Sequence, residues 1–248
     1  MSFSHKTIES KSLGLDIGIC VQVPDFDMES FPVVYLQHGL GDDQNTPWER
    51  THLLPLAEEH PLIIVTSDAK SSWFVNDERS SKLLWEDFFA FELPEYIENN
   101  FPAAKSGNSR GQCGFSMGGY GAMMLALKHP DRFSAVSTHS GSFLFGHEYR
   151  KDRPERAEFM SAVAPPGGDY DLFRLTAEAG KTGRLIPDIR FDVGDKDHLL
   201  EQNRRFHAHL EQYQVLHDYK ENKGSHLWSY VDQHIDESLA FFSAKLTV

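Results

Sequence analysis

Short apolar runs rich in β-branched residues recur along the chain and alternate with longer segments in which apolar residues follow a helical spacing. Apolar runs of this length, with little alternation of apolar and polar positions, are typical of strands that are covered on both faces. They predict strands at residues 17–23, 33–37, 62–67, 110–115, 133–138 and 189–194 and, close to an edge of the sheet, at 215–220.

The segments between these strands carry helical patterns. Helices are predicted for residues 84–101, 117–130 and 199–213, and for a C-terminal segment in which Val231, Ile235, Leu239 and Phe242 recur at helical spacing. Pro94 lies inside the first of these helices, so we expect a kink or a division into two helices there. Strands that alternate with helices predict an α/β fold, a mostly parallel twisted sheet of about eight strands with helices on both faces.

Residues 142–187 interrupt this alternation because they are rich in charged residues, proline and glycine. We interpret this segment as an insertion over one end of the sheet, or a lid, rather than as a separate domain. The length of 248 residues suits one large α/β domain, so residues 1–248 are expected to form a single domain.

The composition supports a globular chain and excludes several classes. Hydrophobic residues make up 40% of the sequence, enough for a sizeable core. The apolar runs are too short to cross a bilayer. The N-terminus lacks the basic stretch and apolar segment of a secretory signal, and Cys20 and Cys113 are too few for a disulfide scaffold. We therefore expect both cysteines to be reduced core residues of a cytoplasmic protein that does not bind a membrane.

The formal net charge of −13 limits the kinds of molecule that the protein is expected to bind. A surface this negative repels phosphate backbones, so a nucleic-acid partner is not expected. A neutral small molecule meets no such repulsion. The sequence is also compatible with a homo-oligomer.

The stretch GFSMGGYG places Ser116 among four glycines, between a predicted strand and a predicted helix. Gly114 and Gly118 flank the serine at two residues on either side, which is the G-x-S-x-G spacing of a nucleophile elbow. Such a turn is so sharp that side chains at these two positions would collide, and it lifts the serine hydroxyl out of the sheet. We expect Gly119 and Gly121 to let the following helix pack close to the strands.

A serine hydroxyl is a weak nucleophile unless a base takes its proton and a carboxylate orients that base. With a nucleophile elbow, the chain order is serine, then the acid, then histidine. Asp195 and Asp197 follow the predicted strand 189–194; we prefer Asp197, with Asp195 as the alternative, although either can be a turn or capping residue. Among 13 histidines, His226 has both the required order and a loop position after the last predicted strand.

Two backbone amides are candidates for an oxyanion hole. The predicted strand 33–37 ends at His38-Gly39, and the N–H of Leu40 is the expected donor from this loop. The N–H of Met117, at the start of the helix that follows the serine, is the second candidate. Two such donors would stabilise the negative charge that develops in a tetrahedral intermediate.

Four segments, YLQHGLGDD, GFSMGGYGAMMLALKHPDRFSAVSTHSG, VGDKDHLLEQNRRF and GSHLW, together resemble the esterase D-like, "putative esterase" group of the α/β-hydrolase superfamily. The similarity covers roughly residues 15–245 and is most specific in SMGGYGA and HPDRFSAV. It implies the α/β-hydrolase fold and a triad of Ser116, Asp197 and His226, with the Leu40 and Met117 amides as oxyanion donors. It also implies that no metal and no organic cofactor is needed.

Within this group the chain is most similar to tributyrin-type short-chain carboxylesterases. The stretch SSWFVND matches a loop near the site of such enzymes, which implies that Trp73 lines the acyl or alcohol pocket; a tryptophan that packs on the core is the alternative. His139, at the end of a predicted strand on the same side, is a candidate for another wall of the pocket. S-formylglutathione hydrolases usually have a different motif in place of HGLGDD and a histidine in place of Phe115, which argues against a glutathione thioester as substrate.

The sequence therefore predicts a serine carboxylesterase for neutral esters with short acyl chains, with acetylated or acylated sugars among the candidate substrates. The alternative is an S-formylglutathione hydrolase-type thioesterase or an acyltransferase on the same triad. A non-catalytic binding module with this fold is more remote, because it would be free to lose the serine, the acid or the histidine.

Overall fold

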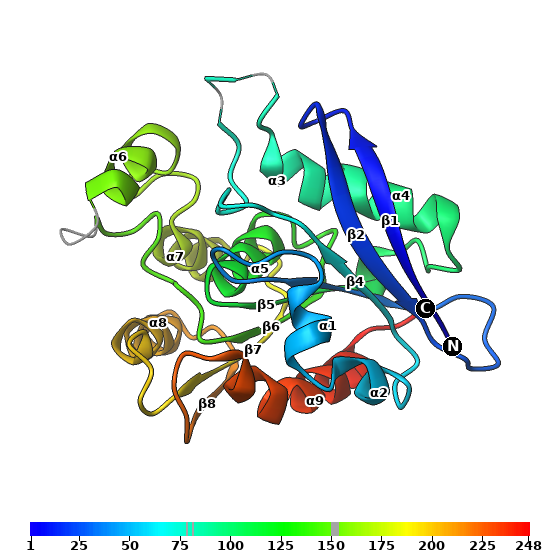
Figure 1. Ribbon diagram of the computed structural model, residues 1–248. Helices are drawn as coiled ribbons and strands as arrows, with labels where there is room; N and C mark the ends of the chain where they lie inside the picture. Colours follow the sequence, from blue (N-terminus) through cyan, green and yellow to red (C-terminus); the bar gives the residue numbers. More distant parts are fainter. Residues whose placement is uncertain (78, 81, 150–153) are drawn as a thin grey trace.

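A computed structural model describes residues 1–77, 79–80, 82–149 and 154–248 (Figure 1). In this part of the chain, eight strands form one sheet in the order β1-β2-β4-β3-β5-β6-β7-β8. The strands are β1 (Ser2–Ser10), β2 (Leu15–Val23), β3 (Val33–Gln37), β4 (Ile63–Ser67), β5 (Arg110–Phe115), β6 (Ala135–His139), β7 (Asp188–Gly194) and β8 (Asp218–Asn222). The strands from β4 to β8 pair in parallel, whereas β1 and β2 form an antiparallel hairpin that joins the sheet through β4.

This arrangement confirms the predicted α/β architecture, and each predicted strand is present with ends that differ by a few residues. The hydrophobic pattern misses β1. Its sequence, SFSHKTIES, is mostly exposed and pairs with β2 at one edge of the sheet. A strand at the edge of a sheet can expose most of its side chains to solvent, so its sequence needs no continuous apolar run. The hydrophobic pattern alone therefore does not predict such a strand.

Helices cover both faces of the sheet. They are α1 (Thr46–Arg50), α2 (Leu53–Ala57), α3 (Trp85–Asp87), α4 (Leu93–Asn100), α5 (Met117–Lys128), α6 (Pro154–Val163), α7 (Leu172–Thr182), α8 (Leu200–Gln212) and α9 (Trp228–Lys245), with a short 3₁₀ helix at Gly107–Ser109. On one face of the sheet, a hydrophobic cluster includes residues of the helices from α3 through α8. On the other face, a second cluster includes residues of α2 and α9. Figure 1 shows α9 and α2 below the sheet and α5 above it.

The helix predicted at residues 84–101 is divided, as Pro94 suggests, but the division takes the form of a π-helical turn. This turn, Phe88–Glu92, separates α3 from α4, and the N–H of Leu93 donates to the carbonyl of Phe88. Pro94 then occupies the first turn of α4, and the carbonyl of Ala90, four residues earlier, accepts a hydrogen bond from Arg132 Nε at 2.7 Å instead.

The buried carboxylate of Glu86 in α3 fixes the far end of α5. Lys128 Nζ and the Tyr170 hydroxyl donate to its Oε2 at 2.8 and 2.7 Å, and His129 Nε2 lies 2.8 Å from Oε1. Burial by itself raises the pKa of Glu86, but these partners outweigh it and lower the pKa to about 2. The charged carboxylate therefore ties α5 to the segment that precedes α7.

The described part of residues 142–187 includes α6 and α7, while residues 150–153 of this predicted insertion lie outside the described residues. That the segment is an insertion or a lid, and that residues 1–248 form one domain, stay predictions. Cys20 and Cys113 are free and buried, as predicted. Over the described residues, no helix is both long enough and apolar enough to cross a membrane.

Candidate active site

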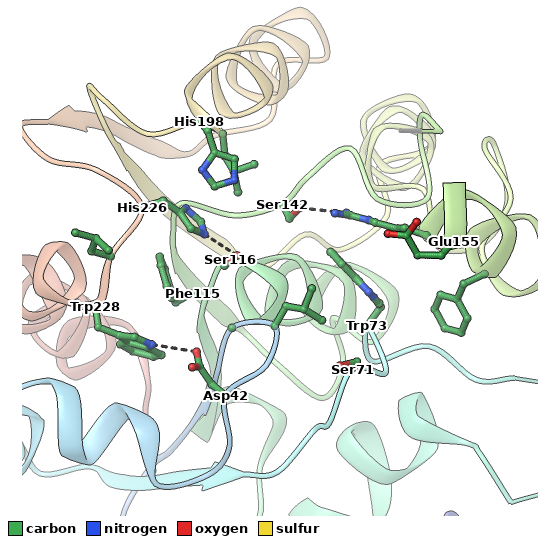
Figure 2. A pocket seen from close by; sticks show the side chains of 16 residues that line it. Asp42, Ser71, Trp73, Phe115, Ser116, Ser142, Glu155, His198, His226 and Trp228 are labelled. Carbon is green, nitrogen blue, oxygen red and sulfur yellow. Dashed lines mark hydrogen bonds between the residues drawn. The ribbon is translucent and has the colours of Figure 1, made fainter. Parts of the chain in front are cut away.

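Three loops at the carboxyl ends of parallel strands bring Ser116, Asp197 and His226 together, at the edge where α/β sheets commonly bind ligands. Ser116 follows β5, Asp197 follows β7 and His226 follows β8. His226 Nε2 lies 2.8 Å from Ser116 Oγ (Figure 2), and His226 Nδ1 lies 2.9 Å from Asp197 Oδ2. This arrangement can move a proton from the serine to an imidazole that a carboxylate orients.

Ser116 lies in a strained turn. Its φ of 58° and ψ of −114° place a non-glycine residue in a rarely populated region of backbone space. A Cβ at Gly114 would lie 2.2 Å from the carbonyl oxygen of Gly118, and a Cβ at Gly118 would lie 2.3 Å from that of Gln37. The turn therefore has no room for side chains at these positions, as the G-x-S-x-G spacing predicts.

The other two glycines of the motif differ in what they make room for. A Cβ at Gly121 would lie 2.0 Å from the ring of Phe74, so Gly121 makes room for the Phe74 loop rather than for the strands. A Cβ at Gly119 would lie 2.9 Å from the Cα of Gly141 and 3.3 Å from the Gly114 carbonyl oxygen, so Gly119 makes room for the Gly141 loop and also for β5, as predicted. Phe74 follows Trp73 directly, so the contact at Gly121 also places Trp73.

The structure separates the two candidate acids. The side chain of Asp197 is fully buried and accepts a hydrogen bond from the N–H of Leu199 at 2.7 Å in addition to its contact with His226. Burial by itself raises the pKa of Asp197, but the bonds to His226 and Leu199 outweigh it, so the pKa lies below its usual value. Asp195 instead accepts a hydrogen bond from the N–H of Gly224 at 3.0 Å, and so shapes the loop before His226.

The loop that carries Leu40 lies next to the serine. A Cβ at Gly39 would lie 3.6 Å from Ser116 Cβ, and Leu40 itself lines the pocket. His38 holds this loop: its Nε2 accepts the Ala69 N–H at 2.9 Å, so its proton is on Nδ1, which donates to the Gly39 carbonyl at 2.7 Å. Burial lowers the pKa of His38, which keeps the ring neutral for both bonds.

Met117 begins α5 directly after Ser116. The N–H groups in the first turn of a helix have no partner inside the helix, so the Met117 amide can donate to another acceptor. The two amides predicted from the sequence thus lie in different elements: Leu40 in the loop that follows β3, and Met117 at the first residue of α5.

Trp228 connects the Leu40 loop to the helix that follows His226. Its Nε1 donates to Asp42 Oδ2 at 3.0 Å (Figure 2). The Phe115 ring lies between the two parts, with its centroid 4.7 Å from that of His226 and 5.0 Å from that of Trp228. These contacts fix the position of His226 relative to the Leu40 loop.

Ser116 lines a pocket with a volume of about 550 Å³. Its lining consists of Gly39, Leu40, Asp42, Ser71, Trp73, Phe115, Ser116, Ser142, Glu155, Arg156, Phe159, His198, Leu199, His226, Leu227 and Trp228. Trp73 is among them, and its ring stacks on that of Phe145 at 4.1 Å, with the Arg156 guanidinium 3.8 Å from the ring centroid. Both Trp73 and Phe74 have positive φ, so this loop is held in an unusual conformation.

The expectation that His139 forms a wall of the pocket is wrong. Its side chain is fully buried, with Nδ1 2.9 Å from Asp192 Oδ1 and Nε2 3.0 Å from Ser238 Oγ. The side chain therefore points away from the pocket, into a polar cluster between the sheet and α9.

His198 is a pocket residue that the sequence reasoning missed. Its ring lies edge-on to that of His226 at 4.5 Å, above Ser116 in Figure 2. The sequence carries a signal for it, because His198 directly follows Asp197. Among the described residues, Asp197, His198 and His226 are also the group whose ligand atoms, all within 4.8 Å of one another, could hold a metal ion.

The mostly parallel sheet, the strained serine after β5 and the order serine, aspartate, histidine define the α/β-hydrolase fold. The sequence model of the family described as "Putative esterase" matches residues 10–242. The chain therefore belongs to this esterase family, which confirms the resemblance seen in the sequence.

Two curated relatives and one solved structure show the range of similarity. Esterase Rv1288 of Mycobacterium tuberculosis is 28% identical over 249 residues, covering 89% of this chain and 54% of that protein, so the chain spans about half of its length. An acetyl esterase of Caldicellulosiruptor saccharolyticus is 23% identical over 229 residues, covering 88% of this chain and 86% of that protein.

The solved structure is an S-formylglutathione hydrolase (FrmB) from Staphylococcus aureus, with a TM-score of 0.85 and 23% identity. The superposition covers 98% of this chain and 100% of that one. At this identity the likeness shows the fold.

Proposed function

We propose that this protein is a serine carboxylesterase that hydrolyses neutral esters with short acyl chains. The observation that carries the proposal is the continuous hydrogen-bonded path from Ser116 Oγ through His226 to the buried Asp197, at the floor of an open pocket. Membership of the esterase family supports the same reaction class.

In the first half of the proposed reaction, Ser116 Oγ attacks the ester carbonyl carbon while His226 Nε2 takes the hydroxyl proton. The Leu40 and Met117 amides donate to the oxyanion, and Asp197 stabilises the imidazolium. As the carbonyl reforms, His226 gives its proton to the leaving alkoxide oxygen, and an acyl-enzyme remains on Ser116. In the second half, His226 takes a proton from water, which attacks the acyl carbon, and then returns that proton to Ser116 Oγ.

The pocket supports a small, uncharged substrate. Among the described residues, its lining combines apolar side chains such as Phe115 and Trp228 with two acidic groups and one guanidinium. Asp42 and Glu155 outnumber Arg156, and this excess of negative charge opposes an anionic acyl or alcohol group. The acetyl esterase among the relatives supports acetate esters as substrates, and acetylated sugars are the first natural acetate esters to try.

The proposal predicts a clear dependence on chain length. With p-nitrophenyl esters from acetate to decanoate, kcat/KM should be highest for the shortest chains and fall steadily as the chain outgrows the pocket. The same assay run with S-formylglutathione tests the thioesterase alternative, and an added alcohol whose ester product is quantified tests the acyltransferase. A maximum at decanoate, or turnover of the thioester alone, would contradict the proposal.

A second prediction concerns the Asp42–Trp228 contact. Trp228→Phe keeps an aromatic ring beside Phe115 but removes the indole N–H, so the Leu40 loop loses one hydrogen bond to a charged group. Such a bond contributes about 1.5 kcal/mol, so we expect kcat to fall about tenfold. KM should change little, because the oxyanion donors act mainly in the transition state.

Trp48→Phe is the matched control for this prediction. It also removes an indole hydrogen bond, from Trp48 Nε1 to Thr66 Oγ1 at 2.8 Å, and Trp48 is not part of the pocket lining. Steady-state kinetics that show equal loss of kcat in both variants would mean that the Asp42–Trp228 contact has no special role in catalysis.

A further inference from the structure

We propose that Asp197, His198 and His226 form a binding site for Zn²⁺, and that zinc bound there reversibly inhibits the enzyme. The site itself is inferred from geometry alone. Its effect on catalysis rests on the function proposed above.

The three side chains fit the coordination chemistry of zinc. Two imidazoles and one carboxylate, with a water in the fourth position, form a common zinc environment. In a tetrahedral site with bonds of about 2.1 Å, neighbouring ligand atoms lie about 3.4 Å apart. His198 Nδ1 already lies 3.6 Å from Asp197 Oδ1, and each of the three residues offers a ligand atom within 4.8 Å of the other two.

Access and charge also favour a cation. The His198 side chain is 60% exposed, so a metal ion can reach it from the solvent side of the pocket. Asp197 accepts a hydrogen bond from the Leu199 N–H and faces His226, and the described lining of the same pocket has two further acidic groups, Asp42 and Glu155, against one guanidinium, that of Arg156. The net charge of −13 further attracts divalent cations to this surface.

Zinc binding and catalysis exclude one another because both nitrogens of His226 are already in use. Nδ1 faces Asp197 and Nε2 faces Ser116 Oγ. If zinc takes the lone pair at Nδ1, the ring proton must be on Nε2, which can then no longer accept the serine proton. If zinc takes the lone pair at Nε2, it replaces the serine there. Either coordination removes the general base.

The test measures esterase activity at increasing zinc chloride, with each variant compared to its own rate without metal. We expect zinc to inhibit the wild type and excess EDTA to restore the rate. His198→Ala should raise the concentration for half-inhibition about tenfold or more, since loss of one ligand costs at least as much as loss of an outer-shell partner. Equal inhibition of both proteins would overturn the proposal.

His52→Ala is the matched control. His52 is also an exposed histidine paired with an aspartate, with Nδ1 2.9 Å from Asp232 Oδ2, and it is not part of the pocket lining. Its half-inhibition concentration should equal that of the wild type. A melting curve without metal shows whether His198→Ala is folded, and His198→Gln provides a second variant that lacks an imidazole nitrogen.

A cobalt titration separates the metal site from the esterase proposal. Co²⁺ bound to two histidines and a carboxylate gives visible absorption bands, and Ser116→Ala should show them as the wild type does, because Ser116 is not a ligand. If the wild type hydrolyses no ester, the proposed function fails, yet the bands still report the site. Bands of equal intensity in the wild type and His198→Ala would overturn the zinc site itself.

Discussion

Ser116→Ala should lower kcat for p-nitrophenyl acetate by about 10⁶-fold, because the variant lacks the oxygen that forms the acyl-enzyme and keeps only the effect of the oxyanion donors and of substrate binding. The substitution removes only Oγ, and the strained turn remains supported by Gly114 and Gly118. The expected result is therefore a folded, inactive protein. Initial rates and a melting curve on the same preparation measure both properties.

Ser142→Ala is the matched control for this variant. Ser142 also lines the pocket, but its hydroxyl accepts a hydrogen bond from Arg156 Nη2 at 3.3 Å rather than facing His226. This variant should still react with a fluorophosphonate, which phosphonylates the nucleophilic serine with loss of fluoride and so increases the mass of the protein, whereas Ser116→Ala should show no such increase. If Ser116→Ala kept substantial activity or still took up the label, Ser116 would not be the nucleophile.

Asp197→Asn is expected to have the next largest effect, a fall in kcat of about 10⁴-fold, as found when the triad aspartate of a serine protease is changed in this way. An amide in place of the carboxylate can donate to His226 Nδ1, which favours the tautomer with its proton on Nε2. Nε2 then cannot accept the serine proton. KM should change much less than kcat, because Asp197 is buried beneath the imidazole.

Asp195→Asn is the matched control, two residues away in the same loop. Asp195 contacts the N–H of Gly224 and not His226, and an asparagine oxygen can still accept that bond. We expect its kcat to stay within a few-fold of the wild type. A larger loss in Asp195→Asn than in Asp197→Asn would reverse the assignment of the acid.

Much of the fold was predictable because its signals are local. Central strands such as β3 and β4 are buried on both faces and therefore appear as continuous apolar runs. The strand β1 was missed because most of its side chains are exposed at a sheet edge, and so its sequence resembles that of a polar loop. The break before α4 was foreseen from Pro94, but its π-helical form was not.

The candidate site likewise has features that the sequence predicts and features that only the tertiary structure shows. The sequence by itself determined the position of Ser116, because a turn that is too tight for side chains requires glycines at fixed offsets along the chain. It also determined that an aspartate and then a histidine should follow, because parallel strands place their carboxyl ends along one edge.

Only the tertiary structure showed that Asp197 contacts His226 and Asp195 does not, that His198 and not His139 lines the pocket, and that Phe74 packs on Gly121. These choices depend on the direction in which each side chain points and on neighbours far away in the sequence. The pattern of residue types along the sequence shows neither the direction of a side chain nor its distant neighbours.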